Sequence, residues 1–220
     1  ARRRMAEMER LAELGTLSGM VAHEMRNSLA TIRLSSDNLG RKTNRPELLR
    51  HIRAISRRVA AGERIITNLL DYTRVQPPKK KKFLILPLVR ECIDLAVKKH
   101  TPKAVSVRTE LAPLRRKKLP ADPDQVRIIL TNILDNAVEA CPPKNGKITV
   151  SARIEGGKSL TLTVTDNGPG LSGEELSEAF NPFFTKKADG NGLGLSVARN
   201  LARLHDGTIE VENAPKKGAI

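Results

Sequence analysis

The stretch VQPPKKKKF, residues 75–83, divides this 220-residue chain into two parts of different character. Two prolines end a preceding helix, and four consecutive lysines repel one another, which favours an extended segment. We therefore expect a linker over residues 77–82, between a first domain at residues 1–76 and a second at residues 83–220.

The residues before this break have the pattern of a helical hairpin. A polar segment, GRKTNRP at residues 40–46, separates two arms in which apolar positions recur every three or four residues. This spacing is typical of a coiled coil. Two such helices have too small a core to be stable alone, so we expect two copies to pair as a homodimeric four-helix bundle. In the first arm, the positions that repeat every seven residues are Leu11, Ser18, Met25, Ile32 and Leu39.

The residues after the break alternate between strand and helix patterns. This alternation predicts an α/β sandwich in which helices cover one face of a sheet, so the whole chain is of the α+β class. The predicted strands are residues 105–111, 147–154, 159–165 and 208–212, and the predicted helices are residues 87–99, 122–141 and 192–205.

The amino-acid composition indicates the type of core and the classes of partner that the chain can have. With 39% hydrophobic residues, four Phe, one Tyr and no Trp, the core must be aliphatic. No run of about 18 apolar residues is present, so we expect no membrane-spanning helix. Cys92 and Cys141 are isolated, as in a cytoplasmic protein with reduced thiols. The net charge of +15 can attract nucleic acid, anionic lipid, an acidic protein or a polyphosphate, and charge alone does not choose among them.

The segment HEMRN, residues 23–27, places reactive side chains on the outside of the first arm. In the heptad that starts at Leu11, His23 occupies the position farthest from the apolar seam, and Asn27 follows one turn later. An accessible imidazole is a competent nucleophile near neutral pH. A single surface histidine usually has no such role, and that is our interpretation of His51, His100 and His205. His23 has a role as a nucleophile only if the second domain binds a substrate that it can attack.

Three polar motifs follow in the second domain, each weak by itself. ILTNILDNAVEA (129–140) puts Asn132 and Asn136 on one helix face, where amide oxygens can bind hydrated Mg²⁺ or simply face water. VTDNGPG (164–170) ends a strand with Asp166, an acceptor for an adenine amine, beside Gly168 and Gly170, which permit close approach or an ordinary turn.

The third motif is DGNGLGLSVARNLARLH (189–205), in which Gly190, Gly192 and Gly194 lead into an amphipathic helix. Backbone N–H groups at such a helix start can bind a triphosphate, although neither a P-loop nor a Rossmann pattern is present. The preceding loop, NPFFTKKADG (181–190), has the composition of a lid. Its phenylalanines can also be plain hydrophobic anchors.

Taken together, these motifs resemble those of the sensor histidine kinases of two-component systems. In order, HEMRN is similar to the H box, TNILDNA (131–137) to the N box, DNGPG (166–170) to the first glycine box, NPFF (181–184) to the F box and GNGLGLS (190–196) to the second glycine box. The resemblance covers nearly the whole chain. It implies a dimerisation and phosphotransfer domain followed by a Bergerat-type ATP-binding domain of the GHKL superfamily.

The resemblance also implies roles for individual residues. His23 would attack the γ-phosphorus of ATP, Glu24 would act as its base, and a response regulator aspartate would then take the phosphoryl group. Asn27 would orient water in dephosphorylation of that regulator. Asn136 would bind Mg²⁺, with Asn132 one turn before it, and Asp166 would bind adenine. The remaining nucleotide contacts implied are Gly168, Gly170, Phe183, Lys187, Gly190, Gly192, Leu193 and Gly194.

The sequence departs from the family in two places. Ser28 stands where the family usually has proline, so we expect a straighter helix there. The chain ends at GAI (218–220), where the family continues into a strand, so we expect a cytoplasmic portion of a longer protein, without membrane contact of its own and with a sensor or membrane region upstream. The rival hypotheses are a dimeric ATP-binding scaffold or phosphatase-dominant partner, and a nucleic-acid binder. The latter lacks interleaved aromatic residues, so we expect no nucleic-acid partner.

Overall fold

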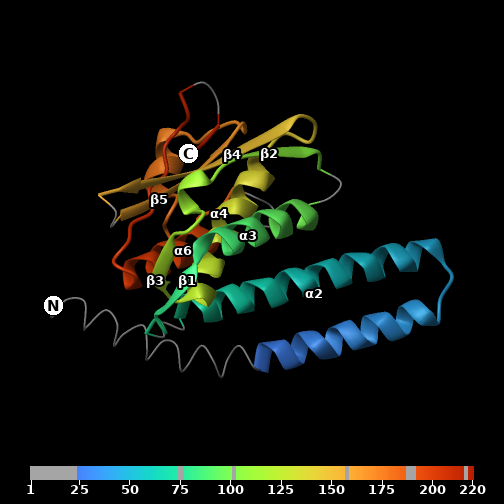
Figure 1. The fold of residues 1–220 in the computed structure, drawn as a ribbon. Coiled ribbons are helices and arrows are strands. Elements are labelled where there is room, and N and C mark those ends of the chain that lie inside the picture. The colour runs from blue at the N-terminus through green and yellow to red at the C-terminus, as the bar shows by residue number, and fades with distance from the viewer. Residues whose placement is uncertain (1–23, 74–76, 101–102, 157–158, 187–191, 216–217) are drawn as a thin grey trace. The chain divides into compact units, whose positions relative to one another are not determined.

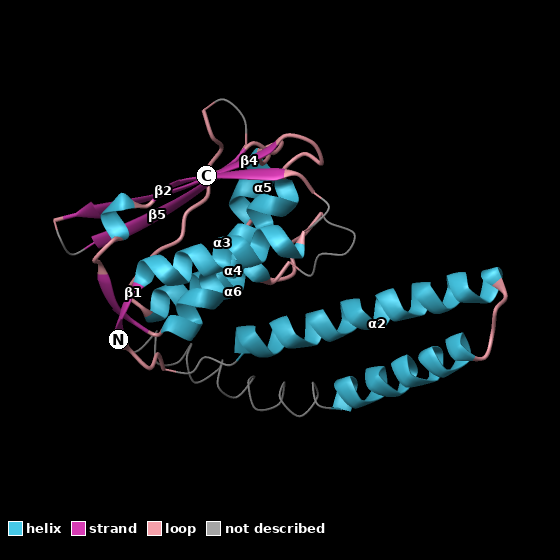
Figure 2. Cartoon of the chain, turned by 45° about the vertical axis from the view of Figure 1, so that its right-hand side comes forward, coloured by secondary structure: helices cyan, strands magenta, loops and turns pink. Residues whose placement is uncertain are grey.

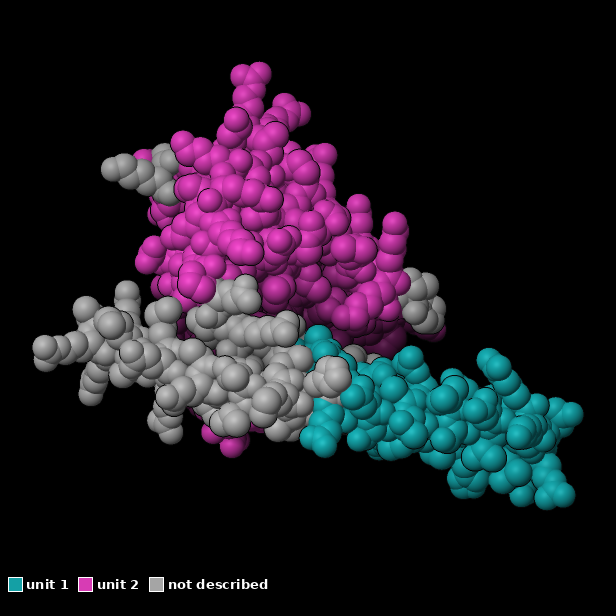
Figure 3. Space-filling model, turned by 90° about the horizontal axis from the view of Figure 1, so that it is seen from below, with its two compact units in different colours: residues 1–76, 185–193 teal, residues 77–184, 194–220 magenta. Residues whose placement is uncertain are grey.

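The computed structural model describes residues 24–73, 77–100, 103–156, 159–186, 192–215 and 218–220. The chain forms two compact units, residues 1–76 with 185–193, and residues 77–184 with 194–220 (Figure 3). His23, Leu11, Ser18, Lys187 and Gly190 lie outside the described residues.

The described part of the first unit contains two helices, as the heptad pattern predicted (Figure 1). One helix runs through residues 24–41, and α2 spans Pro46–Thr73. Gly62 of α2 allows close contact between them, because a Cβ at this position would lie 3.1 Å from Leu29 Cδ1. Val59 and Ile66 of α2 are buried.

Several other apolar side chains of these helices are open to solvent in the single chain. Met25, Ile32 and Leu39, seven residues apart, are 49%, 48% and 60% exposed. On α2, Leu48 and Ile55 repeat the spacing and are 44% and 42% exposed. Each helix thus has one apolar stripe that its hairpin partner does not cover.

The second unit contains a three-stranded sheet with the order β2-β4-β5. β2 (Val105–Glu110) is parallel to β4 (Gly146–Glu155), which pairs antiparallel with β5 (Ser159–Asp166). The helices α3 (Ile85–Lys99), α4 (Pro123–Ala140) and α6 (Gly194–Leu204) form a layer against one face of this sheet (Figure 2). The predicted sandwich is therefore confirmed.

An aliphatic core lies between sheet and helices, as the scarcity of aromatic residues required. Residues that alternate along β4 point inward, including Ile148 and Val150, each 2% exposed. The core is completed by α3, α4 and the 3-10 turn η1 (Ala112–Leu114), which contribute Ile85, Val89, Leu114, Leu134 and Val138.

Two short strands that the sequence pattern did not predict form a separate ribbon. β1 (Lys81–Leu84) pairs antiparallel with β3 (Lys118–Ala121). Their sequences, KKFL and KLPA, lack a long apolar alternation, but Phe83 and Leu119 pack against the core. The structure thus places Lys81 and Lys82 in a strand.

The predicted strand at residues 208–212 is wrong. This segment has no strand assignment, and the nearest ladder contact is an isolated bridge between Asn213 and Ala219. Glu212 and Ile220 exchange backbone hydrogen bonds of 3.2 and 2.8 Å. A strand requires a continuous partner, and residues 218–220 are too few to provide one for the whole segment. A short helix that we did not predict, α5 (Gly173–Glu178), begins at a capping box formed by Ser172 and Glu175.

Candidate functional site

The helix α4 forms one wall of the candidate site. Its N-terminus is capped by Asp122, whose carboxylate accepts hydrogen bonds from the backbone N–H groups of Asp124, Gln125 and Lys79 at 3.0, 3.3 and 2.8 Å. Burial of Asp122 works to raise its pKa, but these three N–H donors outweigh that effect and lower it. The cap fixes the start of the helix that carries both candidate amides.

Asn132 and Asn136 lie one turn apart on α4, and both are partly buried. Asn132 Nδ2 donates to the Ile128 carbonyl at 2.9 Å, which fixes the orientation of the amide. Its Oδ1 faces the start of α6, since a Cβ added at Gly194 would lie 2.7 Å from that oxygen. The second glycine-rich motif thus meets the N-box helix at a position where a larger residue would require the Asn132 amide to move.

Asp166 ends β5 and is 7% exposed. Its Oδ1 accepts a hydrogen bond from the Gly168 backbone N–H at 2.7 Å and a longer one from the Ala219 N–H at 3.4 Å. Within the described residues, no donor is hydrogen-bonded to Oδ2. One carboxylate oxygen is therefore held by the protein, and the other is available to a ligand.

Gly168 brings the Asp166 turn against the other end of α4. A Cβ added at Gly168 would lie 2.7 Å from the Ala140 carbonyl oxygen and 2.8 Å from Asp166 Oδ1. Contacts below about 3 Å do not occur for a real Cβ, so this contact requires glycine. α4 therefore touches both glycine motifs, one near Asn132 and one near its C-terminus.

Gly170 has a positive φ of 79°, which favours glycine. The turn that follows is held by Asn213, a residue that the sequence analysis missed. Asn213 Oδ1 accepts from the Leu171 N–H and its Nδ2 donates to the Leu171 carbonyl, both at 2.7 Å. No sequence signal singles out this asparagine, because its partner lies 42 residues away.

The first glycine box also contains a structural amide, Asn167. Its Oδ1 accepts from the Lys147 N–H at 2.8 Å, and its Nδ2 donates to the Asn145 carbonyl at 3.0 Å. Asn167 therefore connects the end of β5 to the turn before β4. In this motif, its neighbour Asp166 is the candidate for ligand recognition.

The F-box loop contains a strained residue. Phe183 has a φ of 67°, a rare conformation for a bulky side chain, and is 61% exposed. Phe180, by contrast, is fixed, because the Arg199 guanidinium lies 4.9 Å from its ring centroid and donates to its carbonyl at 3.1 Å. Of the other predicted site residues, Gly192 has a φ of 64° and Leu193 is fully buried.

In the first unit, Glu24 and Asn27 are exposed on the helix of residues 24–41. Ser28, in the position of the family's usual proline, donates its hydroxyl to the Glu24 carbonyl at 3.1 Å. The helix is continuous through Ser28, and a straighter axis stays a prediction.

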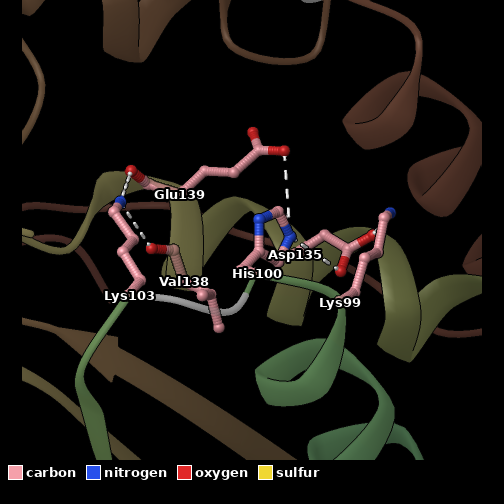
Figure 4. Close-up of polar contacts among 6 residues, drawn as sticks. All are labelled: Lys99, His100, Lys103, Asp135, Val138 and Glu139. Carbon is pink, nitrogen blue, oxygen red and sulfur yellow. Dashed lines mark hydrogen bonds and ion pairs between the residues drawn. The ribbon is translucent and has the colours of Figure 1, made fainter.

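A cluster of polar side chains at and just after the C-terminus of α3 contacts the C-terminal part of α4 (Figure 4). Lys99 forms an ion pair with Asp135, and His100 Nε2 lies 3.4 Å from Asp135 Oδ1 and 4.0 Å from Glu139 Oε1. Lys103 Nζ donates to the carbonyls of Val138 and Glu139 at 3.0 and 2.7 Å. A cation at the last carbonyls of a helix is stabilising.

The remaining titratable candidates are structural. Burial raises the pKa of both the Cys92 and the Cys141 thiols, so neither is a ready nucleophile. Burial, followed by the charge of Lys80, lowers the pKa of His205, whose Nε2 lies 3.1 Å from Gln125 Oε1. His205 is therefore partly buried rather than the surface histidine that we expected, and its lack of a catalytic function stays a prediction.

Comparison with known proteins decides the family. Residues 13–78 match the His Kinase A (phospho-acceptor) domain, and residues 121–220 match the histidine kinase-, DNA gyrase B- and HSP90-like ATPase family. The chain belongs to the sensor histidine kinase family.

Among relatives in this family, the sensor histidine kinase ZraS of Klebsiella oxytoca is 33% identical over 216 residues, covering 98% of this chain and 46% of the relative. The signal transduction histidine-protein kinase AtoS of Escherichia coli K12 is 32% identical over 221 residues, covering 99% and 35%. The chain thus spans less than half the length of these sensor histidine kinases.

Two solved structures are similar to this chain in fold. A crystal structure of histidine kinase ThkA in complex with the response regulator TrrA matches with a TM-score of 0.68 and 28% identity, over 96% of this chain and 61% of that one. Full-length ShkA in complex with AMPPNP matches with a TM-score of 0.76 and 22% identity, over 93% and 44%.

The described residues contain no helix long and apolar enough to cross a membrane. They also contain no group of three or more His, Cys, Asp or Glu side chains that could hold a metal ion. Mg²⁺ commonly binds through one or two protein oxygens together with substrate phosphates and water. The amide of Asn136 fits this pattern, provided that a nucleotide supplies the other ligands.

Proposed function

We propose that this chain is the phosphotransfer and catalytic portion of a sensor histidine kinase, which phosphorylates itself on His23 with ATP and passes the phosphoryl group to an aspartate of a response regulator. The domain organisation we propose is a dimerisation and phosphotransfer hairpin at residues 1–76 and an ATP-binding domain at 83–220. Of residues 77–82, expected to be a linker, Lys81 and Lys82 belong to β1. The observation that carries this proposal is that the Asp166 carboxylate accepts hydrogen bonds from the described residues at Oδ1 but not at Oδ2.

Asp166 suits recognition of adenine. The Gly168 N–H fixes the carboxylate by binding Oδ1 at 2.7 Å, so Oδ2 is held in place to accept a hydrogen bond from the exocyclic amine of the base. The base would lie beside the glycine-rich turn of Gly168 and Gly170. A fixed acceptor loses little conformational freedom on binding, which favours affinity.

The other predicted residues would bind the phosphates and the metal. Asn132 faces the start of α6, where the backbone N–H groups after Gly192 and Gly194 are suited to an anion, and Asn136 follows one turn later on α4. Mg²⁺ bound there would neutralise phosphate charge. Leu193, Gly190, Lys187 and Phe183 would belong to the lid.

On the hairpin, His23 would be the nucleophile, and the exposed carboxylate of Glu24 would accept its proton. Asn27, one turn further along the same helix, would orient water when the regulator is dephosphorylated. The phosphoryl group would thus pass from ATP to an imidazole nitrogen, and from there to a carboxylate oxygen. Positioning and charge neutralisation account for most catalysis in phosphoryl transfer.

A homodimer follows from the exposed apolar stripes. Met25, Ile32 and Leu39 on one helix, with Leu48 and Ile55 on α2, are left uncovered by the hairpin itself. A second copy would bury all five in a four-helix bundle. The ThkA complex with TrrA supports a response regulator as the other partner.

The proposal is tested by nucleotide binding. Asp166→Asn keeps Oδ1 as the acceptor for Gly168 but replaces Oδ2 with an amide N–H₂. We expect ATP affinity to fall about tenfold or more, since hydrogen bonds to charged groups contribute about 1.5–3 kcal/mol. Asp124→Asn, an exposed acid of α4, is the matched control. Equal ATP affinity in the Asp166 variant and wild type would refute the assignment.

A further inference from the structure

Eight basic residues, in two runs that are far apart in the sequence, lie in and beside the β1–β3 ribbon. Lys79–Lys82 precede and enter β1, and the run RRKK at residues 115–118 leads into β3. The antiparallel register pairs Lys82 with Pro120 and Leu84 with Lys118, so Lys82 and Lys118 lie two positions apart across the ribbon and the two runs extend from there in opposite directions. We call these eight residues, together with Leu84, the basic ribbon.

The basic ribbon accounts for the whole charge excess of residues 77–220. Apart from the eight, that segment has sixteen Lys and Arg residues and sixteen Asp and Glu residues. Seven of the eight are exposed, and Lys117 is partly exposed. Lys80 of the ribbon forms an ion pair with Asp206, whose carboxylate lies 3.5 Å away and is itself 81% exposed. The positive charge is therefore largely available to a partner.

The ribbon is anchored to the fold on one face and open on the other. Phe83 and Leu119 are opposite each other and pack against the core. Side chains alternate along a strand, so Lys82, Leu84 and Lys118 point away from the core on the other face. The Lys79 N–H is held by Asp122 Oδ2 at 2.8 Å, so the start of the basic run is fixed rather than loose.

Leu84 determines which partner fits best. It is 45% exposed and stands directly opposite Lys118. A leucine among lysines has no function against the phosphate backbone of nucleic acid, and the outward face has no aromatic or amide group to stack on or read a base. A membrane interface accepts leucine and lysine together, because apolar side chains enter the interface while cationic side chains bind the anionic headgroups.

We propose that the basic ribbon is a docking surface for an anionic lipid membrane. Six of its eight cations are lysines, whose long flexible stems suit mobile headgroups better than a fixed bidentate partner. Clusters of four to eight basic residues are the usual size for binding such surfaces. The proposal changes the expectation from sequence, which assigned no membrane contact to this part of the protein. It is independent of the kinase activity.

The test is co-sedimentation of the chain with lipid vesicles. Wild type should bind vesicles of phosphatidylcholine mixed with phosphatidylglycerol and should not bind phosphatidylcholine alone. The triple variant Lys80→Gln, Lys82→Gln, Lys118→Gln should bind about a hundredfold more weakly. The control Lys98→Gln, Lys144→Gln, Arg153→Gln removes the same charge elsewhere and should bind within a few fold of wild type. Leu84→Ser should weaken binding several-fold at unchanged charge.

Three results would overturn the proposal. Equal losses in the ribbon and control variants would mean that only net charge matters. Equal binding to neutral vesicles would exclude recognition of anionic headgroups. Tight binding to duplex DNA that is unaffected by Leu84→Ser, with no vesicle binding, would assign the surface to nucleic acid. Thermal unfolding of each variant checks that it is folded.

Discussion

Gly168 provides the sharpest test of how the site is built, through the variant Gly168→Ala. The added Cβ would lie 2.7 Å from the Ala140 carbonyl oxygen, 3.1 Å from the Ala140 carbonyl carbon and 2.8 Å from Asp166 Oδ1. Two of these atoms belong to the backbone of α4 and cannot rotate away. Either the end of α4 or the turn after β5 must shift.

The magnitude follows from the cost of overpacking. Inserting a methyl group into a close-packed position costs about 1–3 kcal/mol. For a chain of this size, each 1 kcal/mol lowers the midpoint of thermal unfolding by about 2–4 °C. We therefore expect the midpoint to fall by about 2–12 °C. ATP affinity should fall as well, because the shift moves Asp166.

The assay is thermal unfolding together with an ATP titration, and Gly173→Ala is the matched control. A Cβ at Gly173 would meet nothing within 4 Å, and this residue begins α5, where alanine is the better helix former. The control should be as stable as wild type or slightly more so. If Gly168→Ala unfolds within 1 °C or so of the control and binds ATP equally, the close contact does not position Asp166.

Two further predictions concern stability and assembly. Asp122→Ala removes the cap of α4 and should lower the free energy of unfolding at pH 7 by about 1–2 kcal/mol in denaturant titrations. Because the folded pKa of Asp122 is lowered, its contribution is full above the ordinary pKa of about 3.9 and is lost as the pH falls through the folded value. The difference from wild type should therefore shrink in acid, and a constant difference down to pH 2 or so would contradict the assignment. Ile32→Lys should weaken the dimer about tenfold or more, since it buries an unpaired charge, whereas Leu34→Lys, 64% exposed and outside the stripe, should not. Sedimentation equilibrium measures both, and equal dimerisation of the two variants would rule out the proposed interface.

The helices were predictable because their periodicity is long and regular. Met25, Ile32 and Leu39 repeat over several turns, and the end of each arm is marked by polar residues or proline. The central strands β4 and β5 were predictable for a similar reason, since their apolar residues alternate with threonine and serine.

The basic ribbon was not predictable from local pattern. β1 and β3 are four residues each, and their lysines and proline disfavour a strand. They pair because Phe83 and Leu119 are drawn to the same core from positions far apart in the chain. The prediction of a strand at residues 208–212 was wrong for the opposite reason, since the local pattern favours a strand but the segment has few residues with which to pair.

The site residues were identified by type, but their mutual contacts were not. Asp166, Asn132 and the glycines could be selected from their motifs. The sequence does not reveal that Gly168 touches Ala140 or that Gly194 touches Asn132, because helix packing brings these pairs together. The role of Asn213 could not be predicted for the same reason, because both of its hydrogen bonds are to Leu171, which lies 42 residues away in the sequence.

The central claim is that ATP bound beside Asp166 phosphorylates His23. The most direct measurement is incubation of the chain with γ-labelled ATP and Mg²⁺, with wild type beside His23→Gln. We expect wild type to acquire label in an acid-labile, base-stable bond and the variant to remain unlabelled. Label that persists in the variant, or a wild type that binds ATP without acquiring label, would contradict the account.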